Sequence, residues 1–205
     1  MLKVKFLISI LIFLSISFFF SCIHHKKKRV LNGCCLAGGT SVRLANGKDI
    51  FIENLKVGDT VLAFDKVKKI FSPAKVLRLA QTEHAGFVKL NFNSGEGISD
   101  ENLSSMILTS DHPVWVKDKG WCSFEPEITK RVLAMKDVQK LSAGDFCYSI
   151  NSKKEVTEKK LVSIEKVTGI LKAYTIVQLG RNLDCFLGES IVVGTEPMQA
   201  EDGGE

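Results

Sequence analysis

The sequence is poor in proline and cysteine, with only 4 and 6 of them among 205 residues. Six cysteines are too few for a disulfide-dense scaffold. A chain with 45% hydrophobic residues, 13 phenylalanines and this little proline is neither wholly disordered nor fibrous. Its length allows one ordinary domain or two very small ones.

Acidic residues are missing altogether from residues 1–34, which hold six of the 28 basic residues. Residues 35–205 therefore carry 22 basic against 23 acidic residues, a net charge of −1, although the whole chain carries +5. Nucleic-acid recognition needs a basic face on the folded domain itself. The sequence argues against a nucleic-acid partner, because its positive excess lies beside an apolar leader.

The leader begins with Lys3 and Lys5, and an apolar run from Phe6 to Phe20 follows them. A charged start before an apolar run is the pattern of an export signal. Fifteen helical residues reach about 22 Å, short of the roughly 30 Å hydrocarbon core of a bilayer. We predict residues 1–22 to be a signal peptide, a lipoprotein signal or a membrane anchor, and we favour a signal over a spanning helix.

Phe19-Phe20-Ser21-Cys22 resembles a relaxed bacterial lipobox, in which Cys22 would receive lipid and become the new N-terminus. A predicted basic linker, residues 23–34, follows with four consecutive cations. Each such charge is attracted to anionic lipid by about 1 kcal/mol, and cations also mark the retained side of an anchor. We predict membrane association through residues 1–29, with export to the cell envelope. The sequence leaves open both the membrane side and the choice between lipoprotein and uncleaved anchor.

Short apolar alternations separated by turn signals predict an all-β domain from Cys35 onward. Asn46-Gly47 predicts a hairpin turn, and residues 127–138 are the one helix-like stretch. Residues 196–205 hold four acidic residues and no basic ones, which predicts a disordered acidic tail. The predicted strands cover residues 40–44, 60–64, 74–79, 87–92, 106–108, 114–116, 161–167, 173–179 and 190–193.

Two stretches share the pattern Leu-x-x-Gly-Asp, at residues 55–59 and 141–145, 86 positions apart. A long apolar segment follows each copy, and we predict a hairpin over 74–92 and another over 161–179. Gly-Asp suits a tight turn entering a strand, because glycine adopts an unusual φ and aspartate bonds to nearby backbone. A chance match is the alternative, but the matching segments favour two related halves.

Two adjacent cysteines, Cys34 and Cys35, precede a small-residue turn at 36–40. The Cys35 thiol can swing back onto the carbonyl of the residue before it, an N-to-S acyl shift that converts an amide into a thioester. Cysteine suits this step because its thiolate is strongly nucleophilic and forms near neutral pH when the surroundings lower the thiol pKa. The alternative is a small buried side chain or half of a disulfide.

A polar turn, Thr109-Ser110-Asp111-His112-Pro113, separates two apolar runs. Histidine is the side chain best matched to proton transfer at pH 7. We expect His112 to protonate the departing amide nitrogen and Thr109 to bond to the scissile carbonyl and orient it. The alternative is a turn with no chemical role.

Several ordered motifs resemble the N-terminal blocks of Hint domains, the self-processing module shared by inteins and hedgehog autoprocessing domains. They are Cys35-Leu-Ala-Gly-Gly-Thr-x-Val-x-Leu-x-x-Gly, Ile52-x-x-Leu55-x-x-Gly58-Asp59-x-Val61 and Thr109-x-x-His112-Pro113. Residues 114–121 and 141–145 resemble the bacterial branch found in exported proteins and polymorphic toxins. The resemblance covers residues 35–195 and implies an all-β, pseudo-two-fold Hint disc after the N-terminal signal or anchor.

The resemblance also implies site residues. Cys35 would be the nucleophile, Thr109 the orienting hydroxyl, and His112 the histidine that assists the acyl shift. The scissile bond would join Cys34 to Cys35, and the substrate would be the chain's own N-terminal segment. No cofactor and no metal are implied, and each molecule would cut once as a single-turnover cysteine domain.

The C-terminal block departs from the family pattern, because the positions expected to be His-Asn are Gly194-Thr195. Glu196 follows, where splicing needs Cys, Ser or Thr. Asparagine cyclisation requires a side-chain carboxamide at the junction, and this sequence has none there. We therefore expect no complete splicing. Asp184 or Cys185 lies where other family members place assisting groups, and either is a candidate extra base or ligand.

The remaining cysteines carry no implied role. Cys185 precedes Phe186 and is alternatively part of the core. Cys122 and Cys147 are expected to be packed thiols, or a disulfide if the domain is exported.

The sequence thus supports two hypotheses of different kinds. The first is a membrane-associated Hint domain that cleaves itself at Cys35, with water, a thiol or an amine opening the thioester. The second is a degenerate Hint fold retained as a non-catalytic binding module of the cell envelope.

Overall fold

The computed structural model describes residues 33–93 and 103–196, which we call the β-domain. The chain divides into two units, Met1–Val30 and Leu31–Glu205, and all described residues belong to the second. The predicted leader, most of the predicted basic linker and the tail after residue 196 lie outside the described residues. Within the β-domain, no helix is long and apolar enough to span a bilayer.

Strands dominate the β-domain, as the alternating apolar pattern predicts. All nine predicted strands are present, and the six that the sequence did not reveal are each five residues or shorter. The strands are β1 (Leu36–Ala37), β2 (Ser41–Arg43), β3 (Asp49–Phe51), β4 (Thr60–Asp65), β5 (Ile70–His84), β6 (Phe87–Asn93), β7 (Leu103–Thr109), β8 (Val114–Val116), β9 (Gly120–Ser123), β10 (Gln139–Lys140), β11 (Phe146–Ile150), β12 (Val156–Val167), β13 (Leu171–Leu179), β14 (Cys185–Gly188) and β15 (Ile191–Gly194). The described helical segments are η1 (Ile52–Asn54), α2 (Pro126–Leu133) and η3 (Gly180–Asn182).

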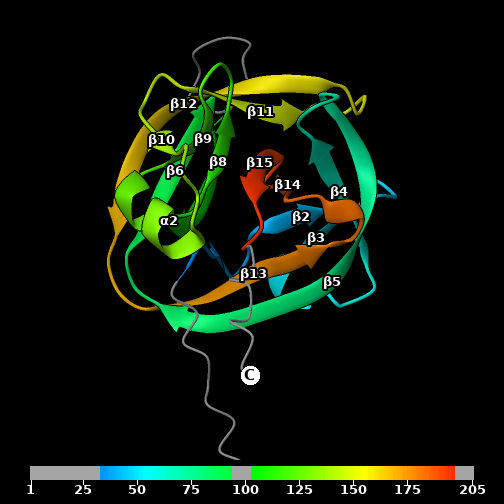
Figure 1. Ribbon diagram of the computed structural model, residues 1–205, viewed down its shortest axis with the longest axis horizontal. Helices are drawn as coiled ribbons and strands as arrows, with labels where there is room; N and C mark the ends of the chain where they lie inside the picture. The colour runs from blue at the N-terminus through cyan, green and yellow to red at the C-terminus, as the bar shows by residue number, and fades with distance from the viewer. Residues whose placement is uncertain (1–32, 94–102, 197–205) are drawn as a thin grey trace, which may run out of the picture. The chain divides into compact units, whose positions relative to one another are not determined.

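The strands form one continuous sheet that closes on itself. Its order is β10-β9-β8-β15-β11-β12-β6-β7-β1-β13-β5-β4-β14-β2-β3, and β14 additionally pairs with β15. Figure 1 shows this last pair in the middle of the β-domain, with β12 and β5 on opposite sides of the view. The C-terminal strands therefore join the two arms of the sheet at its centre.

The Leu-x-x-Gly-Asp repeat marks two structurally matched turns. Gly58 and Gly144 have φ angles of 100° and 99°, values that glycine adopts without strain. The side chain of the next residue accepts a backbone N–H from three residues earlier, at 2.8 Å for Asp59 and 2.9 Å for Asp145. The glycine N–H donates to the following long strand region at 2.9 Å and 2.8 Å. The predicted relation between the two halves is confirmed at these turns.

The hairpins predicted over 74–92 and 161–179 do not form. β5 and β6 are separated by two residues, yet β5 pairs with β4 and β13, while β6 pairs with β7 and β12. The long strands of the two halves are therefore exchanged, and each completes the sheet of the other half. An apolar alternation specifies a strand and its buried face, but it does not specify which strand pairs with it.

We predict that Gly58→Ala and Gly144→Ala destabilise the β-domain by similar amounts, about 1–2 kcal/mol each, because an L-residue is strained at these φ angles. Urea denaturation measures the change. Gly180→Ala is the control, because its backbone lies outside the left-handed region and an added Cβ would lie 3.6 Å from the nearest atom. A loss confined to one of the two turns would contradict their equivalence.

Candidate functional site

The candidate site lies where four strands begin or end around Cys35. Cys35 directly precedes β1, and Leu36 in β1 pairs with Leu108 of β7 on one side and Tyr174 of β13 on the other. Thr109 ends β7, and β15 ends nearby at Gly194, which binds the residue before β8. The sheet therefore fixes Cys35 from both sides and brings it together with segments far away in the sequence.

Cys35 and Thr109 hold each other through two hydrogen bonds. The Cys35 N–H donates to the Thr109 hydroxyl at 3.0 Å, and the Thr109 N–H donates to the Cys35 carbonyl at 2.9 Å. Both residues are fully buried. The Cys35 nitrogen belongs to the predicted scissile amide, so Thr109 binds the nitrogen of that amide rather than its carbonyl, where the sequence analysis expected it.

The Cys35 thiol is turned back along the chain. Its Sγ donates to the Gly33 carbonyl at 3.1 Å, which places the sulfur beside the backbone on the N-terminal side of the scissile bond. Burial raises the thiol pKa, and the nearby carboxyl groups of Glu196 and Asp111 raise it further. The thiol is therefore protonated at neutral pH.

His112 is fully buried, and burial lowers the pKa of its ring to about 3. The backbone of Cys34 and of Gly194 opposes this effect by favouring the protonated ring. His112 is therefore neutral at pH 7 and lies near the backbone of Cys34 and Gly194. Its expected role, protonating the departing nitrogen, stays a prediction. Neither ring nitrogen makes a hydrogen bond within the described part of the chain.

Two carboxyl groups that the sequence analysis gave no role lie beside the thiols. Asp111 is 4% exposed, and burial raises its pKa, while a hydrogen bond with the Thr109 side chain lowers it. Burial raises the pKa of Glu196 to about 7, the charge of Asp111 raises it as well, and Arg78 lowers it. Both carboxyl groups raise the pKa of the buried Cys34 thiol, so they lie near the scissile bond.

The sequence carried a signal for only one of these carboxyl groups. Asp111 lies inside the polar turn that supplied Thr109 and His112, so its position beside the site follows from that motif. Glu196 was assigned to the acidic tail, but its N–H donates to the Ile176 carbonyl on β13 at 3.1 Å. The folded domain therefore extends to Glu196 and, at its other end, includes the buried Cys34 of the predicted linker.

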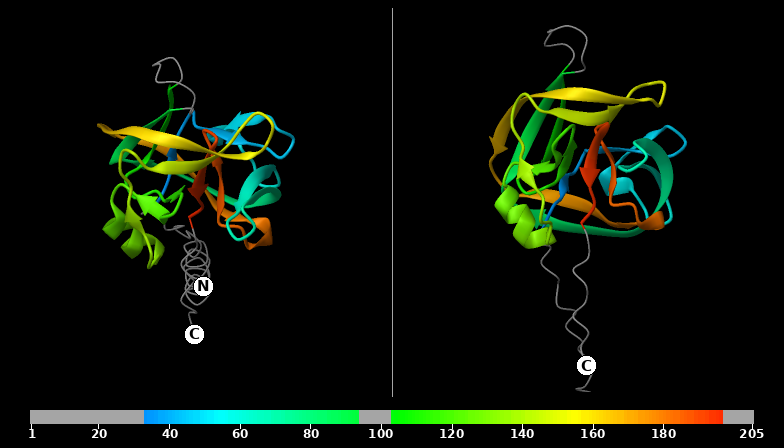
Figure 2. Two further views of the ribbon diagram at one scale, coloured as in Figure 1. Left: turned by 90° about the horizontal axis from the view of Figure 1, so that it is seen from above. Right: turned by 45° about the horizontal axis from the view of Figure 1, so that its top comes forward.

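Helix α2 anchors the polar turn. Thr129 Oγ1 in α2 donates to the Asp111 carbonyl at 2.7 Å, and the Ser110 side chain donates to the Glu125 carboxylate just before the helix. The Glu125 N–H returns a bond to the Ser110 carbonyl at 2.8 Å. Figure 2 shows α2 beside the end of β15. The helix thereby fixes the backbone that carries Thr109 and His112.

Gly194 fits closely against the residue after His112. Its N–H donates to the Pro113 carbonyl at 2.9 Å, and a Cβ built on Gly194 would lie 2.7 Å from Pro113 Cγ. Thr195 donates from its N–H and its hydroxyl to the Asp184 carbonyl at 2.8 Å and 3.2 Å. The position where an intein would carry histidine is therefore occupied by neighbouring atoms.

The candidate assisting groups, Asp184 and Cys185, make their side-chain contacts away from the Cys35 thiol. The Asp184 carboxylate is about half exposed and pairs with Lys66, whose ammonium lies over the rings of Trp115 and Trp121. The Cys185 thiol donates to the Phe64 carbonyl at 3.1 Å within a separate apolar cluster.

The other cysteines of the β-domain are also thiols. Cys122 and Cys147 are buried and free, as are Cys34, Cys35 and Cys185, so the packed-thiol alternative describes Cys122 and Cys147 in this structure. Among residues 33–93 and 103–196, no group of three or more His, Cys, Asp and Glu side chains is arranged to hold a metal ion.

We predict that acid destabilises the protein through His112. Because the folded pKa of about 3 lies below the unfolded value of 6.5, its contribution is complete above pH 6.5 and falls as pH drops toward 3. The free energy of unfolding should fall by about 1.4 kcal/mol per pH unit for this one proton. Urea denaturation between pH 7 and 4 measures the slope of the free energy of unfolding against pH. The His112→Gln variant should lack the part of the slope that comes from His112. Equal slopes for both proteins would contradict the assignment.

We also predict that histidine cannot be restored beside Pro113. Gly194→His should destabilise the β-domain by about 1–3 kcal/mol, because Pro113 must move to admit any Cβ. Gly194→Ala should show part of this loss, whereas Thr195→Ser, which keeps the hydroxyl, should change little. Thermal denaturation compares the three, and a Gly194→His variant as stable as the parent would contradict the predicted clash.

Solved structures of inteins and intein-like domains share this fold. The DnaB intein from Synechocystis sp. PCC 6803 matches with a TM-score of 0.61 at 18% identity, over 80% of this chain and 100% of that one. An intein-like domain from Clostridium thermocellum matches with a TM-score of 0.55 at 23% identity, over 78% and 97% of the two chains. The gp41-1 intein matches with a TM-score of 0.52 at 18% identity, over 80% and 99%. The predicted Hint fold is thereby confirmed, while the bacterial toxin branch stays a prediction.

Sequence comparison gives a different family. No curated protein matches the sequence. The family model of the Ataxin-1 and HBP1 module (AXH) matches residues 36–152, more than half of the chain. This match includes Thr109 and His112 but neither Cys35 nor the strands β12 to β15. By this match the chain belongs to the Ataxin-1 and HBP1 module (AXH) family, and by its structure it has the fold of inteins and intein-like domains.

Proposed function

We propose that the β-domain cleaves its own chain once, through an N-to-S acyl shift at Cys35. The observation that carries the proposal is the arrangement around one peptide bond. The Cys35 nitrogen is held by Thr109, the Cys35 thiol is turned back to the Gly33 carbonyl, and His112 lies against the Cys34 backbone. This arrangement supports an attack by Cys35 on the Cys34 carbonyl carbon.

The chemistry breaks one bond and forms another. The Cys35 sulfur bonds to the Cys34 carbonyl carbon, the bond from that carbon to the Cys35 nitrogen breaks, and a thioester replaces the amide. One proton leaves the sulfur and one arrives at the nitrogen. A neutral His112 has an N–H to offer the carbonyl oxygen as negative charge develops there, which is the role of an oxyanion donor. Thr109 keeps the leaving nitrogen in place.

Water, a thiol or an amine then opens the thioester. The carbonyl of Cys34 passes to that nucleophile, and Cys35 regains its thiol at the new N-terminus of the β-domain. The protein is consumed in the process, so it acts once. Residues 1–34 would be the released segment, and the +6 charge of that segment supports a proposal that it stays at an anionic membrane surface while the β-domain leaves.

The same site argues against splicing. Asparagine cyclisation needs a side-chain carboxamide before the downstream bond, and that position is Thr195, whose hydroxyl is bound to the Asp184 carbonyl. Glu196 offers a carboxyl group where a hydroxyl or thiol nucleophile would be required. One cleavage, at Cys35, is therefore the reaction that these residues support.

We predict that the full chain incubated with hydroxylamine is cut between Cys34 and Cys35, and intact-mass spectrometry measures the products. Cys35→Ala should abolish cleavage, because it removes the nucleophile. Thr109→Val and His112→Ala should slow it, the latter by about 10²-fold or more, in the range of acid–base and oxyanion contributions. Cys122→Ala, which removes a buried thiol elsewhere, should cleave at the parent rate. Cleavage that survives Cys35→Ala would contradict the proposal.

A second function is favoured by one observation, the replacement of the family's His-Asn by Gly194-Thr195 inside a closely packed centre. In that case the β-domain would be a non-catalytic binding module of the cell envelope. A parent protein that stays full length with hydroxylamine while it remains folded would select this function over self-cleavage.

A further inference from the structure

The proposed acyl shift lacks a group that removes the proton from the Cys35 thiol. Burial and two neighbouring carboxyl groups keep this thiol protonated at neutral pH. His112 is a poor acceptor, because burial disfavours its protonated form. Asp111 interacts with the Thr109 side chain, which binds the Cys35 nitrogen, while its Oδ1 makes no hydrogen bond within the described residues. Glu196 is the other carboxyl group near the thiol, and it raises the thiol pKa more than Asp111 does.

Glu196 is fixed at the site by backbone and side chain. Its N–H donates to Ile176 on β13 at 3.1 Å, which continues the strand direction past the end of β15. A Cβ built on Gly33 would lie 3.3 Å from Glu196 Oε1, so this oxygen packs directly against Gly33. The Gly33 carbonyl also accepts the hydrogen bond from the Cys35 thiol, at 3.1 Å. The carboxyl and the thiol are therefore both neighbours of Gly33.

One oxygen of Glu196 is available for a proton. Oε2 is buried and accepts no hydrogen bond from any residue of the β-domain. Among charged groups, Glu196 has the largest effect on the pKa of both Cys34 and Cys35, which agrees with its position beside them. An unpartnered carboxylate oxygen in the neighbourhood of a protonated thiol is a candidate proton acceptor.

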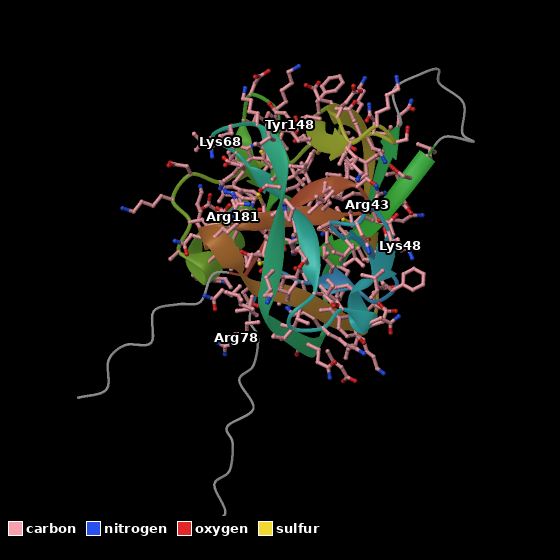
Figure 3. All side chains as sticks on the ribbon, turned by 90° about the vertical axis from the view of Figure 1, so that its right-hand side faces the viewer. Arg43, Lys48, Lys68, Arg78, Tyr148 and Arg181 are labelled. Carbon is pink, nitrogen blue, oxygen red and sulfur yellow. The ribbon has the colours of Figure 1, made fainter. Side chains whose placement is uncertain are left out.

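The surroundings of Glu196 bring its pKa close to neutral pH. Burial raises the pKa of Glu196 to about 7, and the charge of Asp111 acts in the same direction. Arg78 on β5 lowers it, and Figure 3 shows this arginine at the lower edge of the β-domain. The carboxyl group of Glu196 in turn raises the pKa of the Cys34 and Cys35 thiols. A proton acceptor with a pKa near the working pH combines a large ionised fraction with adequate basicity.

We infer that Glu196 accepts the Cys35 thiol proton as the sulfur attacks the Cys34 carbonyl. The same proton then passes to the Cys35 nitrogen as the carbon–nitrogen bond breaks. Sulfur and nitrogen of one cysteine are only three bonds apart, so a carboxyl group that reaches one also lies near the other. The carboxylate is regenerated, and no proton is gained or lost overall. This inference rests on the proposed self-cleavage and assigns its acid–base group.

The test is the pH dependence of thioester formation in the full chain, followed by hydroxylamine trapping at saturating reagent and intact-mass spectrometry. The parent rate should rise about tenfold per pH unit below pH 7 and level off above it, because the carboxylate is the active form. Glu196→Gln should be about 10²- to 10⁴-fold slower and should lose the inflection near pH 7. Glu127→Gln, which alters an exposed glutamate in α2, is the matched control and should behave as the parent.

The outcomes separate this inference from the proposed function. A parent that never cleaves would overturn the proposed function itself. A parent that cleaves, with Glu196→Gln matching its rate and pH profile, would overturn only the role of Glu196.

A third variant, Glu196→Asp, is needed if Glu196→Gln does not fold. If circular dichroism shows that Glu196→Gln is unfolded, Glu196→Asp decides. A slower reaction that keeps an inflection near neutral pH supports the inference, and a profile without one overturns it.

Discussion

The pair of hydrogen bonds between Cys35 and Thr109 is the constraint on which the site depends. It joins the residue before β1 to the last residue of β7, and it holds the nitrogen of one peptide bond at a buried hydroxyl. Every other group of the site is arranged around that fixed nitrogen. The thiol has the preceding backbone within reach, and the ring of His112 lies against the Cys34 backbone.

The exchange of strands between the two halves provides the rigidity that this arrangement needs. β1 is only two residues long, yet it lies between β7 and β13, which belong to different halves of the repeat. β14 and β15 then close the sheet at its centre. A site at the junction of both halves is surrounded by backbone that is paired on both sides, and Cys35, Thr109 and His112 are fully buried there. Burial also makes the Cys35 thiol hard to ionise, so the proposed acyl shift would need a neighbouring proton acceptor.

The sequence predicted what local chemistry determines. The two Gly-Asp turns follow from glycine φ angles and aspartate side-chain bonds within four residues, and the Cys35 and Thr109 motifs follow from ordered spacing. The exchange of the long strands between the two halves was not predictable, because an apolar alternation does not specify which strand pairs with it. Glu196 was assigned to the tail on composition, since its burial depends on Ile176 and Gly33, which are distant in the sequence. The sequence motif likewise did not show that Thr109 binds the nitrogen of the Cys34–Cys35 amide, because that contact depends on the folded chain.

The central claim is that the chain breaks at one defined bond, and the identity of the new N-terminus tests it most directly. After incubation with hydroxylamine, the C-terminal product should have the mass of residues 35–205 and begin with Cys35 carrying a free amine and a free thiol. A product that begins at any other residue, or a folded protein that yields no product, would contradict the account.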